Sequence, residues 1–311
     1  MRENDSTFFN GHGKLLLTGE YFVLDGVPAL AVPTKAGQRF EFHYTRGTSL
    51  TWRAYDHEGG LWFQSDLSSP DMGGRPRPDD DSFTARLWEI LLAADELNPG
   101  TLHRATYGRA VTSHLEFDRQ WGLGSSSTLI AAVAHFLEVN PYELLERTFG
   151  GSGYDLACAI ATGPIIYERN GSTPKVTALN WHPEWVKNTH FVYRNQKQNS
   201  REGIRAYREK TINHGIMQEI GELTQALIEP SLHLRAAAQI LKRHETLVSE
   251  TLGIPTVREE LFPDFPGQLK SLGAWGGDFI WAVSEESDDK VRRYFNARGF
   301  GTVIRYGEMV L

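Results

Sequence analysis

Trp121 to Thr128 reads WGLGSSST, a stretch whose glycines and hydroxyls have the chemistry to hold phosphate. Glycines let a turn bring backbone N–H groups close to an anion, and serine hydroxyls add further donors. No lysine follows the last glycine, as a Walker loop would require. The residues alone leave two interpretations open: a Gly/Ser turn that caps the following apolar helix, or a phosphate-binding loop whose cation comes from elsewhere in the chain.

Two further glycine-rich stretches also carry groups with chemical potential. GGSGYD, Gly150 to Asp155, ends in a carboxylate that can accept or orient a proton during phosphoryl transfer. The same carboxylate can instead be the N-cap of the helix LACAIA, and the glycine pair can end the preceding helix. KSLGAWGGD, Lys270 to Asp278, either brings backbone close to a ligand or is a tight turn beside a strand.

The neighbouring residues predict the elements that would position these stretches. RAVTSHLEF, 109–117, alternates like a strand and leads into the Gly/Ser stretch, and STLIAAVAHFLEV, 127–139, has the apolar character of a buried helix. Strand, turn and helix in this order are the context in which a helix N-terminus binds phosphate. PYELLERTFGG, 141–151, predicts a helix ending at a glycine pair, and 152–171 predict a loop, a small-residue helix and a strand.

The N-terminal part of the chain is rich in strand patterns. QRFEFHY, 38–44, alternates like a half-buried strand, and SLTWRAY, 49–55, is its predicted hairpin partner. FTARLWEILLAADEL, 83–97, predicts a helix that stops at the following Asn-Pro-Gly sequence. Ser68 to Ser82 is dense in Pro, Gly and Asp, which is typical of a linker or of a lid beside an active site.

The composition indicates a soluble globular protein. Its 311 residues suffice for one large domain or two ordinary ones. With 32 Lys and Arg against 39 Asp and Glu, the formal charge is −7, so neither nucleic acid nor an anionic membrane is an expected partner. The lone Cys158 excludes an internal disulfide, and no apolar run is long enough to span a bilayer. We expect a cytoplasmic monomer or homodimer.

A change of sequence texture near Pro183 predicts a domain boundary between residues 175 and 188. After it come a strand pattern, NTHFVY, and amphipathic helix patterns from about residue 202 to 251. The tail adds further strand patterns around the last glycine-rich stretch. We therefore predict an N-terminal domain of residues 1–180 and a C-terminal domain of residues 181–311.

Taken in their order along the chain, the motifs resemble those of the GHMP kinases, the superfamily of galactokinase, homoserine kinase, mevalonate kinase and phosphomevalonate kinase. GKLLLTGEYFVLDGVPALAV, 13–32, comes first, and GLGSSS, SGYD and KSLGAWGG follow. The first motif and residues 150–171 look most like mevalonate and phosphomevalonate kinases. The resemblance implies an α+β fold with a ribosomal-protein-S5-domain-2-like N-terminal half, a ferredoxin-like C-terminal half, and an active site between them.

The resemblance also implies a nucleotide site with its metal. In this family the loop wraps the phosphates of ATP without a Walker lysine, and Ser126 matches the hydroxyl that reaches Mg²⁺. Asp155 matches the catalytic aspartate, and Lys14 matches a lysine near that aspartate and the transferred phosphoryl group. Glu146, or Glu143 in the same helix, is the candidate for a second metal ligand, although neither falls at the family spacing without a gap. The implied ATP-binding residues are Gly122, Leu123, Gly124, Ser125, Ser126 and Ser127.

The substrate end is the part that departs most from the family pattern. The sequence GEY stands where mevalonate kinases have GEH, so Glu20 either contacts substrate or pairs with a nearby cation. Trp275 and Asp278 interrupt the usual Gly-Ala-Gly-Gly-Gly run, which indicates an altered substrate pocket. Arg201 or Arg194 can pair with a carboxylate or phosphate. The predicted substrate-binding residues are Glu20, Gly273, Trp275, Gly276 and Arg201.

These observations favour an ATP- and Mg²⁺-dependent kinase of the mevalonate pathway that phosphorylates mevalonate or 5-phosphomevalonate. Alternatives remain open: a kinase of the same superfamily for a sugar or an amino acid, a diphosphomevalonate decarboxylase, and a non-enzymatic protein that binds ATP in order to contact a partner. Fold resemblance alone does not choose among them, because one fold supports several functions.

Overall fold

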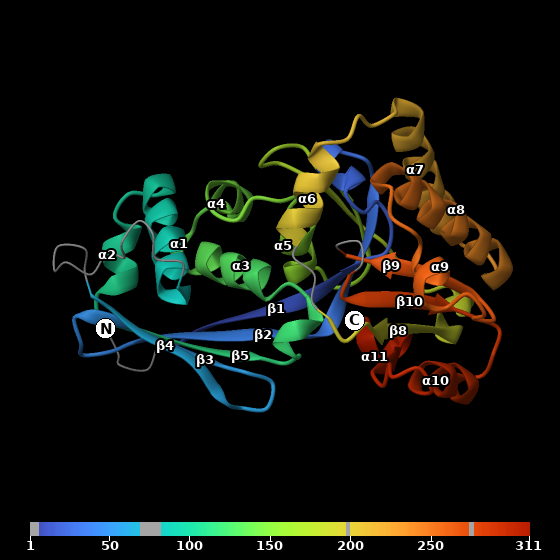
Figure 1. The fold of residues 1–311 in the computed structure, drawn as a ribbon. Coiled ribbons are helices and arrows are strands. Elements are labelled where there is room, and N and C mark those ends of the chain that lie inside the picture. Colours follow the sequence, from blue (N-terminus) through green and yellow to red (C-terminus); the bar gives the residue numbers. More distant parts are fainter. Residues whose placement is uncertain (1–5, 69–81, 197–199, 274–276) are drawn as a thin grey trace.

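The computed structural model describes residues 6–68, 82–196, 200–273 and 277–311. Its strands form a larger sheet from the first part of the chain and a smaller sheet from the last part (Figure 1). The larger sheet has the strand order β4-β3-β5-β2-β6-β7, with β1 paired to β2. Its strands are β1 (Thr7–Leu16), β2 (Ala29–Tyr44), β3 (Ser49–Tyr55), β4 (Leu61–Ser68), β5 (Arg109–Leu115), β6 (Ile165–Glu168) and β7 (Lys175–Ala178).

The predicted hairpin between residues 38–44 and 49–55 is wrong. β5 lies between the two segments: Thr51 of β3 pairs in parallel with Ala110, and Phe42 of β2 pairs in antiparallel fashion with Val111. The antiparallel partner of β3 is β4. The alternating pattern decides which face of a strand is buried, but it does not select the neighbouring strand.

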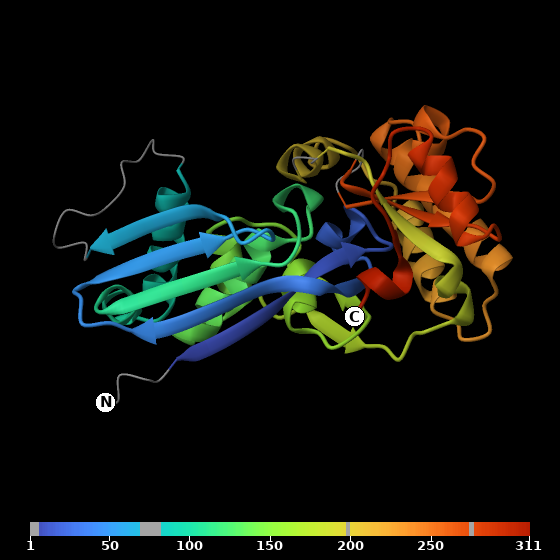
Figure 2. The same cartoon turned by 90° about the horizontal axis from the view of Figure 1, so that it is seen from below.

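Helices cover one face of the larger sheet (Figure 1), and the opposite face is open in the view from below (Figure 2). The long helix predicted after residue 82 begins at its N-cap Ser82, whose side chain accepts a hydrogen bond from the Ala85 N–H at 3.2 Å. Trp88 of this helix and Ile130 of the apolar helix pack in one core with Phe40 and Trp52 of the sheet. The helices are α1 (Phe83–Leu97), α2 (Thr101–Thr106), α3 (Ser125–Leu137), α4 (Pro141–Arg147) and α5 (Tyr154–Ile160).

The smaller sheet is antiparallel, with the order β11-β8-β10-β9. Its connectivity of strand, helices, two strands, helix and strand is that of ferredoxin-like units and is consistent with the expected C-terminal half. The strands are β8 (Thr189–Tyr193), β9 (Gln268–Leu272), β10 (Phe279–Val283) and β11 (Val303–Arg305). The helices are α6 (Ser200–Arg208), α7 (His214–Leu227), α8 (Leu234–Leu252), α9 (Val257–Leu261), α10 (Asp288–Asn296) and α11 (Tyr306–Met309).

The two parts of the molecule share a core. Leu15 and Val32 of the larger sheet belong to one buried cluster with Phe191 and Trp281 of the smaller sheet. The C-terminus also returns to the larger sheet, where the Leu311 N–H donates to the Pro33 carbonyl at 3.1 Å. The predicted boundary near residues 175–188 falls on the connection between the sheets, and the division into two domains stays a prediction.

The described residues bear on the prediction about membranes but not on the suggested lid. Within the described ranges, no helix has both the length and the apolar character that crossing a bilayer needs. The suggested lid, Ser68 to Ser82, lies outside the described residues except at its two ends.

Candidate active site

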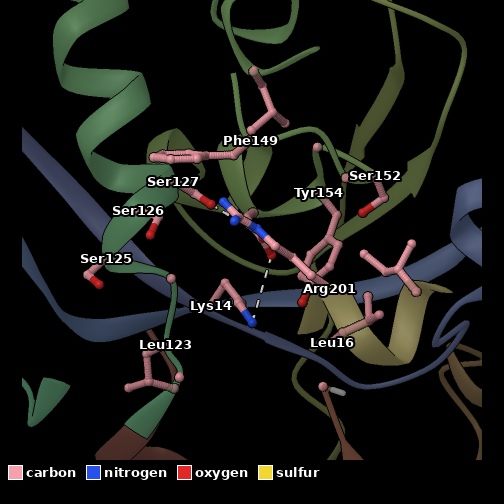
Figure 3. A pocket seen from close by; sticks show the side chains of 18 of the residues that line it. Lys14, Leu16, Leu123, Ser125, Ser126, Ser127, Phe149, Ser152, Tyr154 and Arg201 are labelled. Atoms are coloured by element: carbon pink, nitrogen blue, oxygen red, sulfur yellow. Dashed lines mark hydrogen bonds and ion pairs between the residues drawn. The ribbon is translucent and has the colours of Figure 1, made fainter. Parts of the chain in front are cut away.

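The predicted glycine-rich stretches line one cleft, which lies between the helices of the first part of the chain and the C-terminal part. Its lining includes Lys14 of β1, the loop Gly122–Ser127, the segment Gly150–Asp155, and Gly273 with Asp278. Figure 3 shows the side chains of the three serines on one side of Lys14, with Ser152 on the other. Segments that are distant in sequence thus meet around one lysine.

The Gly/Ser stretch is a turn that opens α3. Gly122 and Gly124 adopt φ values of 64° and 94°, a region that favours glycine. α3 begins at Ser125, and its N-cap is Gly124 with no hydrogen bond from a capping side chain, so capping by a serine or threonine is not what this stretch does. The first turn of a helix has N–H groups without intrahelical partners and a partial positive charge. These groups line the cleft and suit phosphate.

Asp155 lies in the first turn of α5, directly across the cleft from this loop. The N-cap of α5 is Gly153, with φ 88°, so Asp155 is not the capping residue that one interpretation made it. The Ser127 hydroxyl donates to Asp155 Oδ2 at 3.3 Å, which joins the phosphate loop to the carboxylate. The Asp155 side chain remains 30% exposed, so a ligand in the cleft can reach it.

Lys14 provides the cation that the loop itself lacks. Its Nζ lies 3.8 Å from Asp155 Oδ1 and 5.4 Å from the centroid of the Tyr154 ring. The Lys14 N–H donates to the Leu123 carbonyl at 3.0 Å, so β1 is tied to the loop. A Cβ at Gly124 would lie 3.2 Å from Lys14 Cγ, and the glycine therefore leaves room for the lysine stem.

Tyr154 and Cys158 are buried beside the carboxylate and remain neutral. Burial raises the pKa of the Tyr154 phenol well above its usual value, and the adjacent Asp155 charge raises it further. Burial also raises the pKa of the Cys158 thiol. A thiol with a raised pKa is a poor nucleophile, so covalent catalysis by this cysteine is not supported.

Arg201 is a predicted substrate residue that lines the cleft. It comes from α6, and its guanidinium lies 5.8 Å from the centroid of the Phe149 ring, over the cleft (Figure 3). Arg194 is not part of the lining: its side chain is buried and pairs with Glu260 at 3.3 Å. Of the two arginine candidates, Arg201 alone is placed to meet an anionic ligand in this cleft.

Glu20 does not line the cleft, which corrects the predicted substrate contact. Its side chain is 1% exposed and pairs with the Lys270 ammonium, which is fully buried. The other interpretation of Glu20, pairing with a nearby cation, describes its position. Burial raises the pKa of Glu20, and the Lys270 charge opposes that shift.

Glu146 is also misplaced for its predicted role as a metal ligand. It is an exposed residue of α4 that forms an ion pair with Arg169 at 3.6 Å, and neither it nor Glu143 lines the cleft. In the described part of the chain no group of three or more His, Cys, Asp or Glu residues has the arrangement of a metal site. The helix periodicity that carries Leu144 and Leu145 into the core turns Glu146 to solvent.

Two side-chain oxygens at the cleft nevertheless fit a magnesium ion that arrives with nucleotide. Mg²⁺ in nucleotide sites takes one or two protein oxygens, substrate phosphates and water. The exposed Ser126 hydroxyl lies at the loop, and Asp155 Oδ1 accepts no hydrogen bond from the described residues. These two groups are the protein oxygens that would hold the ion.

The third glycine-rich stretch is only partly defined. Gly273 follows β9 with φ 75° and lines the cleft, and its role at the substrate end stays a prediction. Trp275 and Gly276 lie outside the described residues. Asp278 also lines the cleft, and its carboxylate touches the loop so closely that a Cβ at Gly122 would overlap it.

Several residues of the cleft were not predicted from the sequence. Tyr21, Arg119 and Phe149 line it together with the predicted groups. Arg119 stacks on the Trp62 ring, with its guanidinium 3.8 Å from the centroid. Its position three residues before Gly122 is a signal that sequence reasoning could have used, whereas Tyr21 depends on a backbone conformation that no local pattern reveals.

Comparison with known proteins shows likeness in structure only. No protein-family model matches the sequence, and no curated protein matches it. A mevalonate kinase from Methanococcus jannaschii superposes with a TM-score of 0.68 at 16% identity, over 97% of this chain and 98% of that one. A Streptococcus pneumoniae phosphomevalonate kinase, solved with phosphomevalonate and AMPPNP, gives 0.70 at 18% identity, over 97% and 99%.

A further match shows that this fold is shared by proteins with another reaction. A mevalonate diphosphate decarboxylase from Legionella pneumophila superposes with a TM-score of 0.57 at 13% identity, over 96% of this chain and all of that one (100%). The α+β architecture predicted from the motifs is therefore confirmed. Identities this low establish the fold and leave the reaction to be argued from the site.

Proposed function

We propose that this chain, which has the GHMP kinase fold, is an ATP-dependent phosphotransferase that phosphorylates a small anionic acceptor, either mevalonate or 5-phosphomevalonate. The observation that carries the proposal is the Lys14–Asp155 pair, which the hydrogen bond from Ser127 holds at the N-terminus of α3. A cation, a carboxylate and a row of N–H donors in one cleft are the groups that phosphoryl transfer needs.

The triphosphate would lie along Gly122–Ser127. The N–H groups at the start of α3 and the nearby hydroxyls would bond its oxygens, and the helix dipole favours its negative charge. Ser126 and Asp155 would hold the Mg²⁺ that accompanies ATP, and this ion supplies neutralisation of phosphate charge. Catalysis of this type rests on positioning and electrostatics rather than on a covalent intermediate.

Asp155 and Lys14 have complementary roles at the point of transfer. With a hydroxyl acceptor, Asp155 accepts its hydrogen bond and orients its oxygen for attack on the γ-phosphorus. As the new O–P bond forms, the bond from the γ-phosphorus to the bridging β,γ-oxygen breaks and ADP leaves. The hydroxyl proton passes to Asp155 or solvent, whereas an ionised phosphate acceptor attacks without a proton to lose. Lys14 stabilises the charge on the transferred group.

The acceptor side of the cleft indicates an anionic, partly apolar molecule. Arg201 provides a guanidinium that pairs with carboxylate or phosphate. Leu16 and Ile204 line the same region and favour an aliphatic carbon chain. Mevalonate offers a carboxylate and a hydroxyl, and 5-phosphomevalonate offers a carboxylate and a phosphate oxygen. Neutral sugars lack a group for Arg201.

The test is ADP release from Mg-ATP with mevalonate, 5-phosphomevalonate, homoserine and galactose, using purified full-length protein. Turnover with one of the first two acceptors supports the proposal. Turnover only with homoserine or galactose assigns a different acceptor to the same chemistry. Addition of diphosphomevalonate distinguishes the decarboxylase alternative, because that reaction releases CO₂ and phosphate with ADP. Tight ATP binding without turnover of any compound would contradict the enzymatic proposal and favour a partner-binding role.

A further inference from the structure

The turn that follows β1 is fastened to the C-terminal part by buried polar contacts. The Thr224 hydroxyl of α7 donates to the Thr18 hydroxyl at 2.8 Å. The Gly19 N–H donates to His244 Nε2 of α8 at 2.9 Å. The next residue, Glu20, pairs with Lys270 of β9. Successive residues of one turn thus contact three separate elements of the other half of the molecule.

The last of these contacts belongs to a cluster of charges without access to water. Lys270 is 0% exposed, and its ammonium lies 3.9 Å from Glu245 Oε2 in addition to contacting Glu20. Glu245 accepts hydrogen bonds from the N–H and the hydroxyl of Ser271, at 3.1 and 2.9 Å. Removing charges from water costs free energy that offsets much of their mutual attraction. A gain in stability alone therefore does not explain the cluster. Buried ionic groups can instead fix one arrangement of two surfaces.

The arrangement that this cluster fixes includes a residue of the cleft. Tyr21 follows Glu20 directly and adopts φ 62° and ψ −45°, an unusual conformation for a non-glycine residue. Such a conformation persists only where the surroundings determine it, and it is frequent at functional sites. The Tyr21 ring lines the cleft and stacks on Tyr207 of α6, with centroids 5.5 Å apart. A Cβ at Gly203 of α6 would overlap the Tyr21 hydroxyl.

Lys270, the partner of Glu20, is also close in sequence to a residue of the cleft. Lys270 lies three residues before Gly273, at which β9 leaves the sheet and enters the cleft lining. The pair therefore joins two parts of the cleft lining, one carrying Tyr21 and one carrying Gly273. Neither Glu20 nor Lys270 touches the cleft, so both act through their neighbours.

We infer that Glu20 and Lys270 are positioning residues, whose buried pair joins the two halves of the molecule and holds Tyr21 and Gly273 in register in the cleft that receives the acceptor. The inference rests on the proposed kinase function for its effect on turnover. The phosphate loop and α3 belong to the first half, and the contacts of Glu20 and Lys270 within the described residues lie elsewhere. Loss of the pair thus impairs alignment of the acceptor and leaves nucleotide binding intact.

The test compares Glu20→Gln and the double variant Glu20→Gln/Lys270→Met with the wild type. Both exchanges keep the side-chain volume nearly constant, and the double variant removes both charges of the pair. Glu245 loses its cation in that variant, and its buried carboxyl then favours the protonated form, because burial raises its pKa. The matched control is Glu219→Gln/Arg243→Met, which removes an exposed ion pair between α7 and α8, on the same helix as Glu245 but within one half of the molecule. Steady-state kinetics give kcat and the KM values of acceptor and ATP.

Amide hydrogen exchange gives a second readout that does not need activity. The Phe22 and Val23 N–H groups donate to the Glu20 and Gly19 carbonyls, so their exchange reports the state of the turn. We expect kcat to fall by about tenfold or more in the double variant, because small misalignment lowers the effective concentration of the reacting groups. The KM for ATP stays within about twofold, and exchange accelerates in residues 19–24 but not in α3.

The outcomes separate this inference from the proposed function. Wild-type kcat in a folded double variant, or a loss of kcat matched by the surface control, would overturn the inference. If the double variant does not fold, Glu20→Gln decides by the same criteria, because Glu245 still compensates Lys270 in that variant. A wild type without turnover would refute the proposed function. The exchange measurement would then decide on the turn, and unchanged protection of residues 19–24 would overturn the inference.

Discussion

Lys14 Nζ and Asp155 Oδ1 lie 3.8 Å apart, although 140 positions separate the two residues in sequence. The first comes from β1, which pairs with β2 of the larger sheet, and the second from the start of α5. Glycines at positions 124 and 153 permit this approach, the former beside the lysine stem and the latter before the helix. The proposed phosphoryl transfer depends on this pair and on the groups around it.

Replacing Gly122 by alanine is expected to weaken ATP binding. The residue has φ 64°, where a side chain costs about 1–2 kcal/mol, and the added methyl group would overlap the Asp278 carboxylate. The loop must then shift, and the N–H groups at the start of α3 lose their alignment. We expect the Kd for ATP, measured by calorimetry, to rise by about tenfold or more. Gly163→Ala is the control, since open space surrounds that position; equal affinities of both variants would contradict the loop assignment.

Replacing Arg201 by methionine is expected to raise the KM of the anionic acceptor and leave that of ATP unchanged. A hydrogen bond to a charged group contributes about 1.5–3 kcal/mol, which corresponds to a rise in KM of about 10- to 100-fold. Arg205→Met is the matched control, because Arg205 is an exposed residue of the same helix that does not line the cleft. A shift in the KM of ATP instead would place Arg201 on the nucleotide.

The buried cluster predicts a pH dependence of stability. Burial raises the pKa of Glu245 from 4.5 to about 7, against the opposing charge of Lys270. A raised carboxyl pKa stabilises the folded state below the unfolded pKa, and this contribution is lost as pH rises through about 7. His244 acts oppositely, because burial lowers its pKa well below 6.5 and its stabilising contribution is lost as pH falls through that lowered value. Glu20 is the second carboxylate that pairs with the Lys270 ammonium.

The comparison with Glu245→Gln isolates the carboxyl contribution from that of His244, which both proteins share. We expect the wild type to lose roughly 1–3 kcal/mol of unfolding free energy relative to this variant between pH 4.5 and pH 8. Urea denaturation at several pH values measures the difference. Parallel stability curves for the two proteins would show that Glu245 does not titrate in this range.

Much of the cleft was predictable because its residues lie in local motifs. The loop Gly122–Ser127 and Asp155 each stand in a short pattern of strand or loop, glycines and helix, and glycine positions of this kind report backbone requirements directly. The placement of Lys14 and Gly273 in the cleft lining follows their motifs as well. Local patterns also predicted the helices α1 and α3 within a few residues.

The features that depend on distant contacts were not predictable. Glu20 and Lys270 are 250 residues apart, and no local pattern shows that both are buried. The same limit explains the misassigned neighbour of β3, because strand alternation reports a buried face and not a partner. Glu146 was assigned because it lies upstream of Asp155, in the helix before GGSGYD, whereas that helix turns it to solvent. The conformation of Tyr21 follows from its surroundings and not from its residue type.

The most direct test of the account is turnover by Asp155→Asn with the acceptor that the wild type phosphorylates. The exchange keeps the size of the side chain and removes its charge, so the fold and the N–H groups of Gly122–Ser127 that would bind the phosphates of ATP are retained. We expect kcat to fall by about 10²- to 10⁴-fold, as is usual when a positioned acid or base is lost. A variant that transfers phosphate at a rate close to that of the wild type would contradict the assignment of Asp155 and, with it, the kinase chemistry proposed for the cleft.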